Sequence, residues 1–259
     1  MKRLKFEYRT DAVFDGPVTD HGFCLRCIPR EDERQHLEWY TLDIYPETNI
    51  RIAPDVWKNT TTMGFIVKPH REFGFCVRGE VLVDLSRPRK LWNPIFKYPT
   101  EYTQTTPEME HMVNILLKDS TGENPLSRAL RLMNGLYAAF EYRQHVTGIW
   151  TTASEAFKLG CGVCQDYAHV LTAMCLYAGI PARYASGFML GEGYTHAWAE
   201  VFSEGSWYGL DPTNNLMVDE TYIKLAHGRH AADCSVVRGA FRGVVSETQK
   251  INVYVEELK

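Results

Sequence analysis

Hydrophobic and polar positions alternate along much of the first hundred residues. Leu4, Phe6 and Tyr8 are separated by charged side chains, which is the period-two pattern of a half-buried β-strand. Four more strands, bounded by turns that contain proline or asparagine, are predicted at residues 22–28, 35–45, 62–67 and 79–85. No segment in this half favours a helix, so residues 1–105 are predicted to form an all-β N-terminal domain.

A helical period replaces this alternation further along the chain. Between residues 92 and 122 the pattern is weak, and a linker with one short helix at 108–117 is predicted there. Apolar residues then recur every three or four positions from Leu126 to Phe140, which predicts an amphipathic helix.

Two further helices have recognisable end signals. Thr152 and Glu155 have the spacing of a capping box, which predicts the start of a short second helix. A third helix is predicted to begin at Cys164 or just before it and to end near Ala178, because Gly179 is a typical C-terminal stop.

Strands are predicted again after these helices, at residues 183–190, 195–202, 207–210 and 250–256. A run of helices followed by a run of strands is typical of an α+β domain. The predicted fold class is therefore α+β, with an all-β module at 1–105 and a second domain at 106–259.

The composition is that of an ordinary globular protein, with 259 residues, 45% hydrophobic and 23% charged residues and a net charge of -4. A mildly acidic chain lacks the basic surface of a nucleic-acid binder, so no such partner is expected. No apolar run reaches the roughly eighteen residues of a membrane span, and the first residues do not resemble a signal peptide. Seven cysteines, several of them in apolar stretches, favour reduced thiols and a cytoplasmic location.

Cys164 has the position of a reactive thiol. It falls where the third helix begins, and the free N–H groups and dipole of a helix N-terminus favour a thiolate. The same N–H groups can bind the oxyanion of a tetrahedral intermediate. Asp166 and Gln165 are expected to serve this helix N-terminus, and Cys175, in mid-helix, is assigned to the core.

A histidine and an aspartate follow on two predicted strands, His196 at the start of one and Asp211 at the end of the next. A connecting loop of two or four residues places both on one face of the sheet, with Asp211 opposite either His196 or its same-face neighbour Trp198. A thiol needs a base, and the base needs a carboxylate that fixes its tautomer. Cys164, His196 and Asp211 are therefore predicted to form a catalytic triad.

Other arrangements of the histidines and cysteines are weaker. His169 lies about 140° around the helix from Cys164 and is a poor base for it. Cys161 and Cys164 have the C-x-x-C spacing of a thiol-disulfide oxidoreductase or of a regulatory disulfide, but no βαβ pattern precedes them. With Cys24 and Cys27 they would supply four thiols to zinc, although the two pairs lie too far apart for a zinc ribbon. No metal and no cofactor are expected.

Four segments resemble the bacterial transglutaminase-like cysteine enzyme family: Gly160-Cys-Gly-Val-Cys-Gln-Asp-Tyr-Ala-His169, Ala178-Gly-Ile-Pro-Ala-Arg183, Thr195-His-Ala-Trp198 and Leu210-Asp-Pro-Thr-Asn214. The resemblance extends from about Thr152 to the C-terminus, and the first hundred residues resemble, more loosely, the N-terminal module of the family. It implies a papain-like α+β core in which Cys164 is the nucleophile, His196 the general acid and base, and Asp211 the residue that orients His196. Asn214 and Asn215 would be structural.

One segment departs from the family pattern. The family tends to have Gly-Arg-Asp-Tyr-x-Asp after the triad, whereas this chain has Gly228-Arg-His-Ala-Ala-Asp233. If this segment lines the cleft, substrate preference is expected to differ from that of relatives.

The resemblance leaves the reaction open. Thiolate attack on an amide gives a thioester, which water hydrolyses or an amine intercepts in crosslinking. Because bacterial relatives are mostly regarded as hydrolases or proteases, hydrolysis of a peptide or related amide is favoured, with transglutaminase crosslinking as the alternative. A binding scaffold without activity is a further alternative. The expected partner is a peptide or protein substrate, and the second oxyanion donor stays open, with Trp150 as one candidate.

Overall fold

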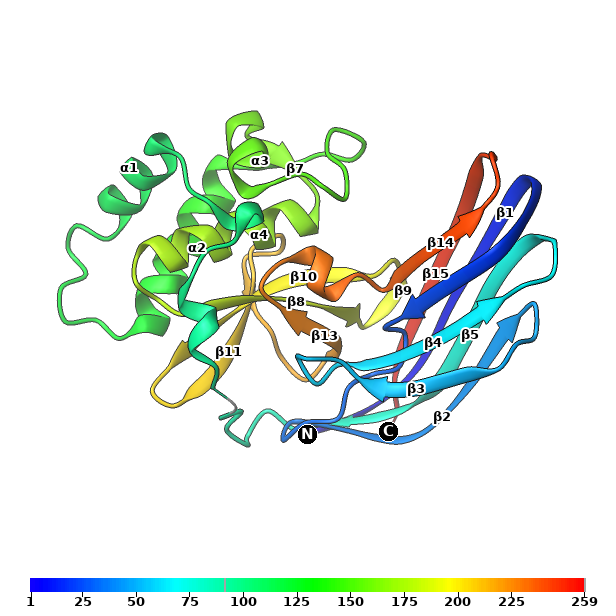
Figure 1. Cartoon of the computed structure of the whole chain (residues 1–259). Coiled ribbons are helices and arrows are strands. Elements are labelled where there is room, and N and C mark those ends of the chain that lie inside the picture. Colours follow the sequence, from blue (N-terminus) through cyan, green and yellow to red (C-terminus); the bar gives the residue numbers. More distant parts are fainter. Residues whose placement is uncertain (91, 259) are drawn as a thin grey trace.

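The structure is a computed structural model that describes residues 1–90 and 92–258. Two antiparallel sheets form the cores of two lobes (Figure 1). The first sheet has eight strands, and its longest path has the order β2-β5-β1-β15-β9. Its members are β1 (Lys2–Leu25), β2 (Gln35–Tyr45), β3 (Ile50–Pro54), β4 (Thr60–Ile66), β5 (His70–Val83), β9 (Gly191–Gly193), β14 (Val237–Arg242) and β15 (Glu247–Leu258).

The alternating pattern at the start of the chain produces one long strand. In β1 the side chains of Leu4, Phe6 and Tyr8 are buried, while those between them lie on the other face. The register breaks between Val13 and Val18, so the strand pairs mainly with β5 and β15 before the break and with β4 and β14 after it. The prediction of two separate strands here is wrong, because a single bent strand serves both parts of the sheet.

The C-terminal strand also belongs to the first lobe, which corrects its predicted place among the strands of the second domain. β15 pairs with β1 from Arg3↔Leu258 to Phe14↔Glu247, and Figure 1 shows the two chain ends side by side in this sheet. β14 pairs with β1 as well. Both ends of the chain therefore build the first sheet, and most of the second lobe lies between β5 and β14 in the sequence.

The second lobe has a five-stranded sheet in the order β12-β11-β10-β8-β13, with helices packed on one face. Its strands are β8 (Ala182–Met189), β10 (His196–Ser203), β11 (Ser206–Asp211), β12 (Leu216–Met217) and β13 (Tyr222–Gly228). Its helices are α1 (Pro107–Leu116), α2 (Pro125–Ala139), α3 (Ala153–Leu159) and α4 (Cys164–Tyr177). Two short strands, β6 (Glu141–Tyr142) and β7 (Cys161–Gly162), pair beside them. This is the predicted α+β architecture.

Local signals set the helix ends as predicted. In α3 the Thr152 hydroxyl accepts a hydrogen bond from the N–H of Glu155, whose carboxylate accepts one from the N–H of Thr152. Gly160 ends α3 with φ +67°, and Gly179 follows α4 with φ +74°. α4 begins at Cys164 itself, so the predicted placement of this thiol on the helix is confirmed.

Two hydrophobic cores stabilise the lobes. One is formed mainly by buried side chains of the first sheet and includes Phe188 and Ile223 of the second sheet. The other lies between the helices and the second sheet and includes Leu136, Tyr167 and Leu171. Because the first core contains side chains from both sheets, the lobes pack against each other as parts of one interior.

A buried carboxylate binds several cations where the lobes meet. Glu200 on β10 lies 2.6 Å from the Nε of Arg183, 2.6 Å from the Nζ of Lys224 and 2.8 Å from Nη1 of Arg89. Arg89, in the connection after β5, also lies 2.9 Å from Asp32 of the first lobe. These ion pairs fix β10 against the first lobe.

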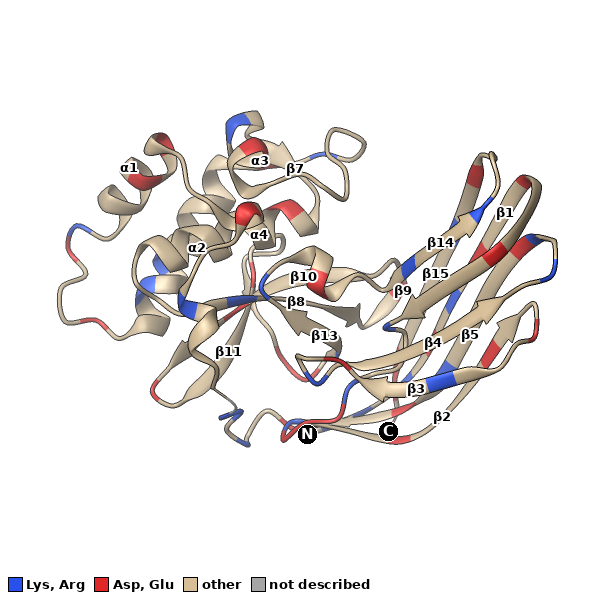
Figure 2. Cartoon of the chain, in the orientation of Figure 1, with Lys and Arg blue, Asp and Glu red and all other residues tan. Residues whose placement is uncertain are grey.

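Basic and acidic residues occur on both lobes (Figure 2), and no helix in the described part of the chain is long and apolar enough to cross a bilayer.

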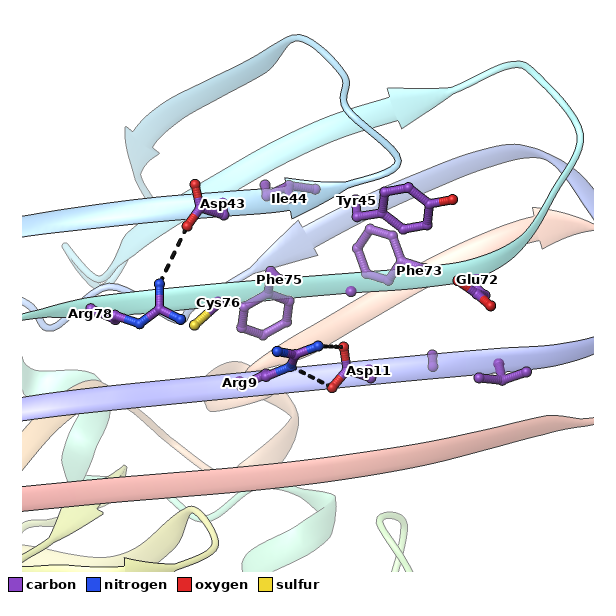
Figure 3. A pocket seen from close by; sticks show the side chains of 13 residues that line it. Arg9, Asp11, Asp43, Ile44, Tyr45, Glu72, Phe73, Phe75, Cys76 and Arg78 are labelled. Carbon is purple, nitrogen blue, oxygen red and sulfur yellow. Dashed lines mark hydrogen bonds and ion pairs between the residues drawn. The ribbon is translucent and has the colours of Figure 1, made fainter.

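A groove of about 500 Å³ crosses the first sheet near Gly74, with Arg9, Asp11 and Arg78 among its lining residues (Figure 3). All residues that line it belong to the first lobe, so it lies apart from Cys164.

Candidate active site

Cys164 lies at the abrupt start of α4, and its side chain is partly exposed. The chain before it is extended through β7 and Val163. The N–H groups of Asp166 and Tyr167 donate to the carbonyl of Val163, so those of Cys164 and Gln165 lie ahead of the helical ladder. The thiol is therefore beside the positive end of the helix dipole.

The next two residues hold the first turn of α4 in place. The carboxylate of Asp166 accepts hydrogen bonds from the N–H of Val163 at 2.8 Å and from Thr147 Oγ1 at 2.7 Å, as its predicted capping role requires. Gln165 does not serve the helix N-terminus, contrary to the prediction. Its Nε2 instead donates to the carbonyl of Gly148 at 3.2 Å and so attaches a neighbouring loop to the helix.

His196 and Asp211 meet on the hairpin formed by β10 and β11. The register pairs Ala199 with Leu210 around a two-residue loop at 204–205, which places Asp211 opposite Trp198. This is one of the two registers that the sequence allowed. The Nε2 of His196 and the Oδ2 of Asp211 are 2.7 Å apart.

The carboxylate of Asp211 is completely buried and surrounded by donors. Its Oδ2 accepts from His196, from Asn214 Nδ2 at 2.8 Å and from the hydroxyl of Tyr222 at 2.9 Å. Its Oδ1 accepts from the N–H groups of Thr213 and Asn214 at 3.0 and 3.3 Å. Burial alone would raise the pKa of Asp211, but these bonds hold it below its usual value.

The imidazole of His196 has partners on both sides. Its Nε2 is bonded to Asp211, and the thiol of Cys164 also acts on the ring by favouring its charged form. Burial disfavours the imidazolium, but the bonds to Asp211 and Cys164 outweigh it and raise the pKa of His196 to about 9. Trp198 stacks against the ring with centroids 6.5 Å apart. The structure thus brings the three predicted residues together at an imidazole whose pKa is raised.

His169 is excluded from this arrangement, as expected. It is fully buried, and its Nε2 accepts a hydrogen bond from the N–H of Ala231 at 2.9 Å. Burial and the neighbouring His230 lower its pKa to about 3. A neutral histidine whose Nε2 is already occupied cannot serve as the base for Cys164.

The backbone separates Cys161 from Cys164. Residues 161–163 are extended, which places the two Cα atoms about 10 Å apart, whereas a disulfide needs less than about 7 Å. All seven cysteines are free. A disulfide between these two would require the start of α4 to move, which argues against both the redox motif and the regulatory disulfide.

The zinc alternative has no structural support either. Cys24 and Cys27 lie at the end of β1 and just beyond it. Cys27 packs in the first core, and burial raises the pKa of its thiol to about 12, which disfavours the thiolate that zinc needs. Among residues 1–90 and 92–258, no three His, Cys, Asp or Glu side chains are grouped as a metal site would require.

The segment that departs from the family pattern contributes to the surroundings of Cys164. Ala231 packs on the same small apolar cluster as Cys164. His230 stacks on Tyr102 with centroids 4.5 Å apart, and Arg229 donates to the carboxylate of Asp233 at 3.0 Å. Of the two residues that differ from the family pattern, Ala231 therefore shares a cluster with Cys164, whereas His230 packs on Tyr102.

Comparison with known proteins identifies the family. Residues 116–212 match the model of the Transglutaminase-like superfamily, and residues 4–82 match the Bacterial transglutaminase-like N-terminal region. An uncharacterised protein of Mycobacterium bovis is 30% identical over 98% of this chain and 92% of its own length. The chain belongs to the transglutaminase-like superfamily. A second relative, from Mycobacterium leprae, is 25% identical over 94% of each chain.

A solved structure shows the same fold. The crystal structure of a "Putative Cysteine Protease" from Cytophaga hutchinsonii covers 100% of this chain and 92% of its own, with a TM-score of 0.80 and 23% identity. The predicted transglutaminase-like core with a β-rich N-terminal region is thereby confirmed. Membership of the superfamily indicates a thiol-based enzyme.

Sequence reasoning missed Tyr222, whose hydroxyl bonds to Asp211. Tyr222 begins β13, the edge strand that pairs with β8 in the second sheet. No local motif around it signals a contact with Asp211. Asn214 was expected to be structural, and it holds Asp211 through both its side chain and its backbone.

Proposed function

We propose that this protein is a cysteine hydrolase that cleaves a peptide or a related amide bond through a thioester. Cys164 supplies the nucleophile, His196 the general acid and base, and Asp211 the carboxylate that orients the imidazole. The observation that carries the proposal is the 2.7 Å hydrogen bond between Nε2 of His196 and the buried carboxylate of Asp211. The thiol of Cys164 acts on the same imidazole and raises its pKa. These three groups in this sequence of contacts are what nucleophilic acyl transfer requires.

In the first half of the reaction the sulfur of Cys164 attacks the amide carbonyl carbon and forms a C–S bond. The oxyanion accepts hydrogen bonds from the N–H groups at the start of α4, which lie ahead of the helical ladder. His196 gives its Nδ1 proton to the leaving nitrogen, the C–N bond breaks, and the amine departs. A thioester on Cys164 and a neutral imidazole remain.

In the second half the neutral His196 takes a proton from water at Nδ1 while the water oxygen attacks the thioester. The C–S bond breaks, the carboxylic acid product leaves, and the thiolate and imidazolium are restored. Asp211 accepts the Nε2–H throughout and so keeps Nδ1 directed at the reacting atoms. An amine in place of water would give a new amide, which is the crosslinking alternative. The name of the Cytophaga structure supports hydrolysis.

The first test measures the rate of Cys164 alkylation by iodoacetamide against pH, with mass spectrometry to locate the label. Selective labelling of Cys164 is expected well below the free-thiol pKa of about 8.5, and His196→Ala should abolish it. His36→Ala is the matched control, because His36 is exposed in the first lobe. Labelling that rises only near pH 8.5, and equally in His196→Ala, would contradict the proposal and favour a binding scaffold.

The second test separates hydrolysis from crosslinking. Peptides of known sequence are incubated with the enzyme, with and without a primary amine, and the products are identified by mass. Hydrolysis predicts cleaved or deamidated peptides whose formation does not need the amine and is lost in Cys164→Ser. Products that form only with the amine and incorporate it would identify a transferase instead.

A further inference from the structure

The loop between β6 and α3, residues 143–152, is fixed relative to the thiol. Gln165, the neighbour of Cys164, donates to the carbonyl of Gly148 at 3.2 Å. The loop is also closed on itself, because the N–H of Gly148 donates to Thr151 Oγ1 at 2.9 Å and the N–H of Thr151 donates to the carbonyl of Gly148 at 3.1 Å. Figure 1 shows this loop projecting beside β7.

This fixed loop presents large apolar side chains to solvent. Ile149 is 70% exposed and Trp150 63% exposed, and both follow the glycine that Gln165 holds. Single exposed apolar side chains are ordinary, but two adjacent ones on a hydrogen-bonded loop form a surface that favours burial by a partner. Because the loop is already ordered, binding there costs little conformational entropy.

A cavity of about 670 Å³ opens between this loop and α3, and we name it the Trp150 pocket. Its lining residues are Gly148, Trp150, Thr151, Glu155, Lys158 and Leu159. Leu159 is itself 55% exposed, so Trp150 and Leu159 give the pocket apolar surface. Its volume lies within the range of about 300–1,000 Å³ that is typical of ligand pockets.

We propose that the Trp150 pocket binds a large apolar side chain of the peptide substrate, with an aromatic ring as the best fit, close to the bond that Cys164 attacks. The inference rests on the proposed function and adds the substrate class to it. Its support is continuity, because the loop that carries the indole is bonded to the residue that follows the nucleophile. Aromatic rings pack favourably on the face or edge of an indole, whereas a small polar side chain would leave it exposed.

The test compares iodoacetamide with N-phenylalkyl iodoacetamides that carry the ring on one to four methylene groups. Rate constants at Cys164 are measured in wild type and in Trp150→Ala, and each is divided by the rate with free cysteine. At least one ring-bearing reagent should react roughly tenfold faster than iodoacetamide in wild type. In Trp150→Ala the corrected rate constant of this reagent, divided by that of iodoacetamide, should fall nearly to one. Use of the ratio removes any effect of the substitution on the thiol itself.

Trp39→Ala is the matched control, since Trp39 is 44% exposed on β2 of the first lobe. It should keep the full preference for the ring-bearing reagent. No gain for any chain length in wild type, or a gain that survives in Trp150→Ala, would overturn the inference. An iodoacetamide rate that does not depend on His196 would contradict the proposed function instead, so the two failures are distinguishable.

Discussion

Two carboxylates are buried on neighbouring strands of the second sheet, and they differ in their partners. Glu200 on β10 is 1% exposed and is bound by basic side chains, namely Arg89, Arg183 and Lys224. Asp211 on β11 is 0% exposed and is bound by neutral donors and one histidine, His196. Because burial is nearly equal, the difference between the two sites lies in the groups that face each carboxylate.

This difference separates a structural cluster from a reactive one. Arginine keeps its charge at any physiological pH. Burial would raise the pKa of Glu200, but the surrounding cations hold it well below its usual value. A histidine changes its charge near neutrality, so a proton can move at the pair of His196 and Asp211. The low-dielectric interior strengthens both sets of contacts, and only the second includes a group on which the thiol of Cys164 acts.

The substitution with the largest expected effect is Asp211→Asn, which breaks the reactive pair and keeps its shape. Two backbone N–H groups bond to Oδ1, so the new amide nitrogen takes the place of Oδ2 and faces Nε2 of His196. The imidazole must then carry its proton on Nδ1, which is the wrong tautomer. We expect kcat/KM for a peptide substrate to fall by about 10⁴-fold.

The control for this variant is Asp43→Asn, since the side chain of Asp43 is 75% exposed on the first lobe. It should leave turnover unchanged. Thermal unfolding of Asp211→Asn should show that the fold is retained. A kcat/KM within tenfold of wild type would mean that Asp211 does not orient the base.

Glu200→Gln should break the structural cluster and leave the chemistry intact in the molecules that fold. Arg183 and Lys224 would lose a buried counter-ion, which costs about 3–5 kcal/mol of unfolding free energy. The melting temperature should fall by roughly 10 °C. Glu192→Gln, on the exposed strand β9, is the matched control. A loss below about 1 kcal/mol would show that the ion pairs contribute little to stability.

The features of the reactive pair that depend on local structure could be predicted from the sequence. The shared face of His196 and Asp211 follows from strand alternation and a short turn, and the start of α4 follows from end signals around Cys164. The partners of Glu200 and the contact of Tyr222 with Asp211 could not be predicted. They come together only after β13, β8 and β10 are ordered in the sheet, and local periodicity does not specify that order.

The first lobe shows the same limit. The period of residues 250–256 predicts a strand, but it does not specify that the strand pairs with β1 rather than with the second sheet. β3 was missed because both of its faces are largely exposed, so its sequence lacks a clear alternation between apolar and polar residues. An alternating sequence pattern reflects the burial of one face of a strand, and β3 has little buried surface.

The pH dependence of the reaction should distinguish the two clusters. The pKa of His196 is raised from 6.5 to about 9, so the imidazolium is present below this value and is lost as pH rises through it. We expect kcat/KM to fall above about pH 9, by about tenfold per pH unit. The profile is measured by initial rates with a cleaved peptide from pH 6 to about 11.

Two variants test whether this alkaline limb belongs to His196. In Asp211→Asn the alkaline limb should move to lower pH, because the carboxylate that favours the imidazolium is gone. In Glu200→Gln, studied below its melting temperature, the limb should stay in place. An alkaline limb at the same pH in wild type and Asp211→Asn would assign it to a group other than His196.

The smallest effect is expected for Tyr222→Phe, which removes one of three donors to Oδ2 of Asp211. The ring can keep its edge contact with Trp198, at 5.6 Å between centroids, so stability should change by only about 1 kcal/mol. Without the hydroxyl of Tyr222, the negative charge on Asp211 is neutralised less by hydrogen bonds. It therefore attracts the imidazolium of His196 more strongly. The alkaline limb should therefore move upward by about 0.3 pH units, with a few-fold loss of kcat/KM. Tyr254→Phe, on the exposed face of β15, should change neither value. A loss of stability in Tyr222→Phe without a shift of the limb would place Tyr222 with the structural contacts, because a donor that acts through Asp211 must alter the proton affinity of His196.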